Sequence, residues 1–262
     1  MPSPRKPEKG TPAPTRARPG RPRKPQTDAA AAAVLGRERI LQATLALIDE
    51  KGLAAFNIRA LATALGVYPA AIYWHVPSRD ALVAGAIGLA MQNVATRLPE
   101  GGWQLRLAAV MRGFRDALRA HPHLAPAVAS ELATNVNVDA PLIDYVLAAL
   151  EEARFEGPAL VDAFNVVIAA MCGFATLELS AAPAEAAAEW QDACRSRIDA
   201  VDAQRHPHLA RHVGELRNQA FMLRWASGRE QPLHSSFDAW IDVVIRGLEA
   251  RSRMLRRPVR VA

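Results

Sequence analysis

The chain has 262 residues, of which 50% are hydrophobic but only 6% aromatic, and it carries a net charge of +6. This composition favours a helical bundle over a β-sandwich, and the length allows one large domain or two small ones. No apolar run reaches the roughly 18 residues of a transmembrane helix, and the basic N-terminus lacks the apolar stretch of a secretory signal. The two cysteines, Cys172 and Cys194, provide neither a disulfide framework nor zinc spacing, so we expect a cytoplasmic protein without membrane contact.

The positive charge is concentrated at the N-terminus. Residues 1–28 contain eight basic and two acidic side chains, so they account for the whole net charge of +6. This segment is rich in proline and charge and poor in large apolar side chains. We therefore predict a disordered basic arm over residues 1–33 that contacts a polyanion.

Within this arm, the Gly-Arg-Pro-Arg-Lys-Pro stretch at residues 20–25 resembles an AT-hook, an element that lies in the minor groove of A·T-rich DNA. Arg21 and Arg23 would enter the negative potential of that groove. Pro19 departs from the pattern, because a basic residue usually precedes the glycine. The alternative is a solvated linker with general affinity for DNA.

Three short helices and the start of a longer one are predicted next. The first is expected over residues 37–50, where Gly52 ends it. The second is capped by Asn57 and turns Leu61 and Leu65 inward before Gly66 ends it. The apolar stripe that predicts the first helix consists of Ile40, Leu41, Thr44, Leu45 and Ile48.

The third helix, over residues 69–75, is unusually decorated. Pro69 suits its first position, and Ile72 and Val76 lie one turn apart and would anchor it in the core. Ser78 then caps the fourth helix. The third helix presents a flat patch of small residues, Ala70 and Ala71, flanked by the polar tips of Tyr73, Trp74 and His75. Such a surface fits a DNA groove. The alternative is that Tyr73 and Trp74 belong to the core, as a Tyr-Trp pair often does.

These motifs resemble the tetracycline-repressor (TetR) family, in the order Leu65-Gly66-Val67, Ile72-Tyr73-Trp74-His75-Val76 and Ser78-Arg79-Asp80-Ala81-Leu82. A weaker similarity to the ligand-binding domain of the tetracycline-repressor subgroup continues in Trp103-Gln104, Phe114 and the last helix. The resemblance implies an all-α fold with a three-helix helix-turn-helix DNA-binding domain. We assign this domain to residues 34–80, a larger ligand-binding and dimerisation domain to 81–255, and a tail to 256–262.

The resemblance also implies roles for single residues. Arg59 stands where the subgroup places a base-contacting arginine, and Arg79 matches a basic position that contacts the DNA backbone. His75 would approach a phosphate, while Tyr73 and Trp74 would offer polar tips and ring faces. The leading edge of the recognition helix consists of Tyr68, Pro69, Ala70 and Ala71. Because Tyr68 and the alanine pair differ from the residues of many relatives, the operator sequence is not predicted.

Further amphipathic helices are predicted beyond residue 97. The helix over 158–180 is apolar nearly all round and should therefore be buried on all sides. The resemblance implies that this helix and the last helix form a four-helix dimer interface, the alternative being the core of a monomer. The expected spans are 103–119, 124–134, 140–155, 158–180, 184–204, 208–226 and 236–254.

The mechanism implied by the resemblance is repression released by a small hydrophobic effector, which tilts the fourth helix and changes the spacing of the two recognition helices. No cofactor is expected, and the pocket is more apolar than a tetracycline–magnesium site. The apolar candidates for its lining, which could equally be plain core, are Val110, Met111, Phe114, Leu118, Met171 and Phe174. The candidate polar anchors are His121, Asn165 and Glu178.

Two other functions are weighed against this one. A metal-responsive regulator could use His206, His208 and His212, because the last two are one helical turn apart. Pro207 and the lack of a nearby cysteine favour a solvent-facing loop instead. An enzyme is not expected, because no phosphate loop, nucleophile elbow or paired-carboxylate arrangement is present.

Overall fold

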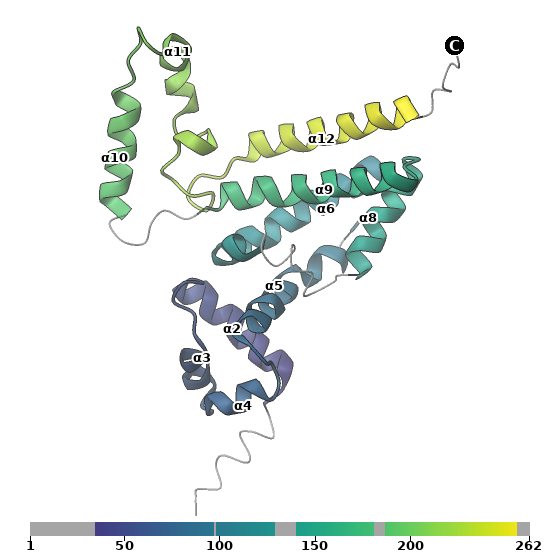
Figure 1. Ribbon diagram of the computed structural model, residues 1–262, viewed down its shortest axis with the longest axis vertical. Coiled ribbons are helices and arrows are strands. Elements are labelled where there is room, and N and C mark those ends of the chain that lie inside the picture. The colour runs from purple at the N-terminus through teal and green to yellow at the C-terminus, as the bar shows by residue number, and fades with distance from the viewer. Residues whose placement is uncertain (1–34, 97, 129–139, 181–186, 256–262) are drawn as a thin grey trace, which may run out of the picture.

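The computed structural model describes residues 35–96, 98–128, 140–180 and 187–255, and these are helices and turns with no strand among them. The all-α prediction is confirmed. The predicted arm with Arg21 and Arg23 and the predicted tail lie outside the described residues. Figure 1 shows a small helical unit at one end, a bundle at the other, and one long helix leading from the first to the second.

The small unit contains the three predicted short helices, as α2 (Arg37–Lys51), α3 (Ile58–Leu65) and α4 (Pro69–Tyr73). The predicted third helix is two residues too long, since Trp74 forms the C-cap of α4. The buried face of α2 also differs slightly from the predicted stripe, because Leu47 is buried and Leu45 only half-buried.

The predicted caps hold these helices. Asn57 Oδ1 accepts a hydrogen bond from the Ala60 N–H at 2.9 Å, and Ser78 Oγ accepts one from the Ala81 N–H at 3.0 Å. Gly66 is left-handed, with φ of 68°, and this conformation lets its backbone close the end of α3 at no steric cost. The turn between α3 and α4 is therefore fixed by local chemistry.

The long helix α5 (Arg79–Thr96) joins the two parts, because it packs on α2 at one end and on α6 at the other. Its contact with α2 depends on Gly85. A Cβ atom at this position would lie 2.4 Å from Leu41 Cδ2, closer than van der Waals contact allows. The absence of a side chain at Gly85 thus lets α5 pack closely on α2.

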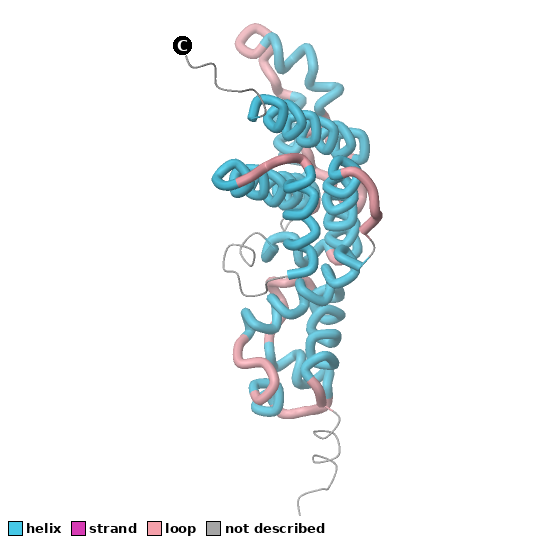
Figure 2. The backbone as a smooth tube through the Cα atoms, turned by 90° about the vertical axis from the view of Figure 1, so that its right-hand side faces the viewer, coloured by secondary structure: helices cyan, strands magenta, loops and turns pink. Residues whose placement is uncertain are grey.

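The bundle is built around α6 (Trp103–Ala120), which packs on α5, α8 (Ala140–Glu152), α9 (Gly157–Glu178) and α12 (His234–Leu255). The helices α9 and α12 run antiparallel beside each other (Figure 1). Figure 2 shows the resulting elongated molecule from the side, and the short helices of the small unit lie at its lower tip.

The region between α9 and α12 departs from the predicted spans. The helix α10 (Ala187–Asp199) ends before the predicted position 204, and the predicted helix over 208–226 is wrong. In its place the structure has a shorter helix, α11 (Pro207–Leu216), followed by a 3₁₀ turn, η2 (Phe221–Leu223). Asn218 explains the break, because it has a positive φ of 57° and its Oδ1 accepts hydrogen bonds from the N–H groups of Trp225 and Ala226.

The predicted helix over 124–134 begins instead with the 3₁₀ turn η1 (Pro122–Leu124). Residues 125–128 are helical, and the rest of that span lies outside the described residues.

The expectation that the apolar helix α9 is buried on all sides is wrong within one chain. The side of α9 that contacts α6, α8 and α12 is buried, but Val161, Val166 and Leu177 face outward, with Val166 48% exposed. By length and composition α9 could also span a membrane. Its packing on three other helices is that of a core helix with one uncovered face.

Candidate DNA-reading surface and effector region

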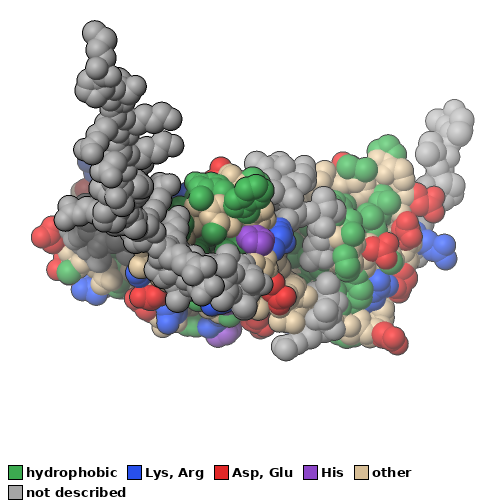
Figure 3. Space-filling view, turned by 90° about the horizontal axis from the view of Figure 1, so that it is seen from below, with side chains coloured by type: hydrophobic (Ala, Val, Ile, Leu, Met, Phe, Trp, Pro, Cys, Tyr) green, Lys and Arg blue, Asp and Glu red, His purple; other side chains and the backbone are tan. Residues whose placement is uncertain are grey.

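The aromatic residues of α4 point away from the core. Ile72 is fully buried and Val76 nearly so, whereas Trp74 is 88% exposed, Tyr68 is 70% exposed and Tyr73 is exposed as well. This distribution rules out the alternative that the aromatic pair belongs to the core. Figure 3, viewed from below, shows hydrophobic side chains gathered on this face of the molecule.

The remaining predicted DNA-contacting residues of this unit lie on the same tip. Arg59 is exposed on the first turn of α3, and Ala70 and His75 are exposed on α4 and just after it, while Pro69 and Ala71 are half-buried. The exposed side chains of this surface are thus aromatic rings, an alanine methyl group, a histidine and the guanidinium of Arg59. Few donors on it can read bases directly.

Arg79 has a different environment from the one implied by the family resemblance. Its Nη2 donates to the Leu53 carbonyl at 3.0 Å and its Nε to the Phe56 carbonyl at 3.3 Å. The guanidinium also lies over the Phe56 ring, 5.6 Å from the centroid. The side chain is therefore engaged within the protein.

The six apolar residues predicted to line an effector pocket lie together. They come from the facing sides of α6 and α9, and all six are buried in one continuous core: Val110, Met111, Phe114, Leu118, Met171 and Phe174.

Glu178 joins this core at the end of α9, but its carboxylate is fully engaged. Arg115 donates to it through Nε and Nη2, both at 2.6 Å, and the Leu233 N–H adds a third bond at 2.8 Å. Burial alone would raise the pKa of Glu178, yet these hydrogen bonds and the positive charge of Arg115 hold the pKa below its ordinary value.

Sequence reasoning missed Arg115. The available signal was its position on α6, one turn after Met111 and beside Phe114, where the apolar stripe should continue. A buried arginine at such a position indicates a buried acidic partner. The guanidinium also lies 4.4 Å from the centroid of the Phe237 ring.

Two predicted polar anchors lie away from this core. Asn165 is on the exposed face of α9, next to Val166. His121 lies at the end of α6, where its Nδ1 is 2.8 Å from Oδ2 of Asp49 on α2. His121 thus connects the bundle to the small unit rather than lining the space between α6 and α9.

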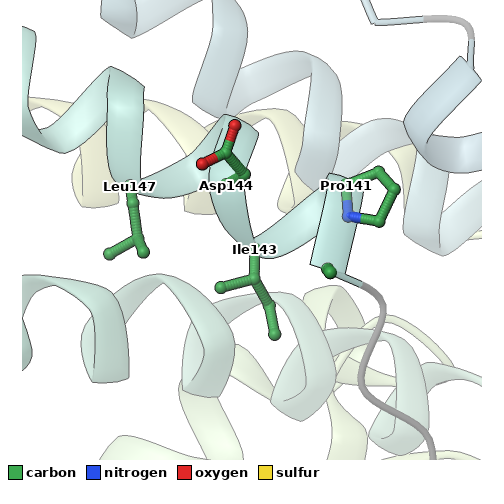
Figure 4. Close-up of a pocket in the computed structure, with 5 residues that line it drawn as sticks. Pro141, Ile143, Asp144 and Leu147 are labelled. Atoms are coloured by element: carbon green, nitrogen blue, oxygen red, sulfur yellow. The ribbon is translucent and has the colours of Figure 1, made fainter.

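A separate hollow of about 480 Å³ opens along α8 and is shallow and open to solvent. None of the predicted ligand-binding residues lines it. Figure 4 shows its lining, which is Ala140, Pro141, Ile143, Asp144 and Leu147.

The histidines considered for metal binding are exposed on α11 and just before it. His212 Nδ1 pairs with Glu215 Oε2 at 2.9 Å, within the same helix. Within the described ranges, no three metal-ligating side chains gather around a common point. The metal-responsive alternative therefore receives no support.

Comparison with known proteins identifies both parts of the chain. Residues 40–86 match the model of bacterial regulatory proteins of the tetR family, and residues 96–251 match the tetracyclin repressor-like C-terminal domain. The chain belongs to the TetR family. It thus combines the N-terminal domain of bacterial regulatory proteins of this family with a tetracyclin repressor-like C-terminal domain.

Individual relatives agree with this assignment. The Escherichia coli tetracycline repressor of class D is 36% identical over 87 residues, which is 32% of this chain and 40% of that repressor. The chain thus spans less than half of the length of this relative. A TetR regulator from Streptomyces coelicolor superimposes with a TM-score of 0.62 at 26% identity, covering 86% of this chain and 100% of its own. BioQ in complex with its double-stranded DNA operator superimposes with a TM-score of 0.51 at 25% identity, covering 55% and 88% respectively.

Proposed function

We propose that this TetR-family protein is a repressor that binds a palindromic DNA operator as a homodimer and leaves it when a small hydrophobic effector binds. The observation that carries the proposal is the tip of the molecule, where α4 keeps Ile72 and Val76 in the core and presents Trp74 and Tyr68 to solvent. A protein without a partner at this surface gains nothing from exposing such large rings.

The proposed DNA contacts follow from this geometry. Arg59 reads a guanine edge, and the alanine pair contacts thymine methyl groups. Tyr73 and Trp74 offer polar tips and ring faces to bases or sugars, and His75 approaches a phosphate. BioQ, which shares the fold, is known bound to its operator, and this supports the same docking end here.

Dimerisation is proposed through the uncovered faces of α9 and α12. Val161, Val166 and Leu177 on α9 are exposed beside Trp240 and Val243 on α12. Two copies packed through these faces form a four-helix interface that removes apolar surface from water. The dimer then presents two α4 helices to successive major grooves, which requires a palindromic operator.

The effector site is proposed in the core between α6 and α9, where the predicted apolar residues meet. An effector that enters this core acts only through its different affinity for the two arrangements of the bundle. Because α6 packs on α5 and α5 packs on α2, a shift of α6 reaches the DNA-reading tip. A DNA-binding regulator with this activity works in the cytoplasm and has no catalytic role.

The proposed domains are the DNA-binding domain at 34–80 and the ligand-binding and dimerisation domain at 81–255, with the arm over 1–33 assisting through Arg21 and Arg23 in the minor groove.

The test is a titration of DNA from just upstream of the protein's own gene against random DNA of equal length, at several salt concentrations. We expect specific binding to exceed non-specific binding by roughly 10³-fold or more. Equal affinity for both fragments at every salt concentration would remove the proposal. Chelator and added zinc serve as a further arm, and neither should change the affinity.

A further inference from the structure

The position of Arg79 has a consequence for how α3 is held. Arg79 is the first residue of α5, whereas both carbonyls that it binds, those of Leu53 and Phe56, belong to the turn between α2 and α3. The guanidinium thus joins segments 23 and 26 residues apart in the chain. The N-terminal end of α5 is thereby linked to the turn between α2 and α3.

The same turn leads directly into α3. Phe56 is buried, and the next residue, Asn57, accepts the Ala60 N–H and donates from Nδ2 to the Ala55 carbonyl at 3.2 Å. The turn is therefore held by Asn57 from its α3 side and by Arg79 from its α5 side. Arg59 follows the cap by two residues, so its direction depends on how this turn is held.

The helices α5 and α3 are otherwise linked through α2, on which both of them pack. The helix α5 packs on α2 and α6, while α3 packs on α2 and α4. Arg79 links α5 to the 53–56 turn, and so to the start of α3, by direct hydrogen bonds. This link does not depend on packing against α2.

An arginine suits this role and a lysine does not. Two carbonyls of one turn must be bound at once while the cation lies on the Phe56 ring, and the planar guanidinium offers donors in several directions and a flat face. A lysine ammonium is a compact point charge that cannot meet both demands in one geometry. The family-based role for Arg79, a contact to the DNA backbone, requires only positive charge.

We propose that Arg79 is a positioning residue that ties the α2–α3 turn to α5 and thereby sets the orientation of Arg59 on the operator. Displacement of α5 then carries the start of α3 with it, so the effector signal reaches Arg59 as well as α4. This inference rests on the proposed operator binding for its functional part, while the structural tie is independent of DNA.

The experiment compares the full chain with Arg79→Lys, Arg79→Met and the control Arg39→Met, which lies on the exposed side of α2. Affinities for the upstream fragment and for random DNA are measured across a salt series. We expect both Arg79 variants to lose roughly tenfold in the ratio of specific to non-specific affinity, with an unchanged salt slope. Arg39→Met removes the same unit of charge as Arg79→Met, from an exposed position on α2. It should weaken binding to both DNAs equally and leave the ratio near that of the native protein.

A pure backbone contact gives a different pattern and would overturn the inference. In that case Arg79→Lys keeps the native ratio, and Arg79→Met weakens binding to both DNAs equally while the salt slope falls by about one. Arg79→Lys keeps the charge and most of the length, so it decides the matter where Arg79→Met fails to fold.

Hydrogen exchange without DNA supplies a second readout. The amides of Phe56, Ala60 and Leu61 are bonded to the turn or its cap, and they should exchange about tenfold faster in Arg79→Lys than in Arg39→Met. Unchanged exchange at these amides refutes the tie. If the native protein fails to discriminate between the two DNAs, the proposed operator function fails, and hydrogen exchange alone decides on Arg79.

Discussion

At the scale of single residues, the short helix α4 exposes some side chains to solvent and buries their neighbours in the core. Tyr73 is exposed while its neighbour Ile72 is fully buried. We therefore expect the two side chains to contribute to different properties, Tyr73 to the proposed operator recognition and Ile72 to stability. Substitutions at adjacent positions should have opposite profiles.

Tyr73→Ala and Arg59→Ala should each cost roughly 1–3 kcal/mol of discrimination between operator and random DNA and leave the melting temperature nearly unchanged. Ile72→Ala should instead cost about 2–5 kcal/mol of unfolding free energy, because it empties a packed site. DNA binding by fluorescence anisotropy and unfolding by denaturant measure the two effects. A large loss of stability in Tyr73→Ala would place this ring in the core after all.

The buried ion pair between Arg115 and Glu178 is the strongest residue-scale feature of the bundle. The side chains are 5% and 0% exposed, and breaking one partner leaves the other charge uncompensated. Glu178→Leu alone should cost roughly 3–5 kcal/mol of unfolding free energy. The double variant Arg115→Met with Glu178→Leu should recover much of that loss, measured by denaturant unfolding, and equal losses in both would argue against an uncompensated charge.

The lowered pKa of Glu178 makes stability depend on pH in one direction. A carboxyl group whose pKa is lower in the folded than in the unfolded state contributes its stability fully above the unfolded value of 4.5. That contribution is lost as the pH falls below this value toward the folded pKa. The native protein should therefore lose more stability on acidification from pH 6 than Glu178→Gln does, and parallel curves for the two proteins would contradict this.

At the scale of helices, α9 and α12 carry an apolar face that one chain leaves uncovered. Val166 and Val243 lie on this face, and both are exposed. A face of this kind on two antiparallel core helices is stable in water when a second copy covers it.

Val166→Asp and Val243→Asp should convert the dimer into a monomer, because each places two like charges in the buried interface. Leu105→Asp is the matched control, since Leu105 is a similarly exposed apolar residue on α6. Light scattering after size-exclusion chromatography gives the molar mass. Dimers that persist in both α9 and α12 variants, or a monomeric native protein, would exclude this interface.

At the scale of the whole molecule, the charge and the reading surface occupy different segments. The net charge of +6 is contributed by residues 1–28, outside the described residues, whereas the tip of the small unit offers rings and methyl groups with few donors. Under the proposed function, we expect the arm to supply most of the affinity for the polyanion and the tip to supply the sequence preference.

Deleting residues 1–28 should weaken binding to operator and random DNA alike and reduce the dependence of affinity on salt, because fewer counterions are released. The ratio between the two DNAs should change much less. A salt series on the shortened and the full-length chain measures both quantities. An unchanged affinity after deletion would reduce the arm to a linker.

Much of the reading unit follows from local chemistry and was predictable. Asn57, Gly66, Pro69 and Ser78 act on their own or adjacent helix ends, and the 3.6-residue repeat assigns Ile72 and Val76 to the core. The predicted outward direction of Trp74 follows from that repeat and is confirmed.

Features that depend on distant partners were not predictable from the sequence. The ends of α11 and the break at Asn218 depend on N–H groups seven and eight residues later. The engagement of Arg79 by the 53–56 turn, of Glu178 by Arg115, and of His121 by Asp49 joins residues 23 to 72 positions apart. Helix ends and apolar faces depend on residues that are close together in the sequence. The sequence alone therefore determines a helical protein and predicts its DNA-reading tip. Which charged side chains remain available to a ligand depends on partners that only folding brings within hydrogen-bonding distance.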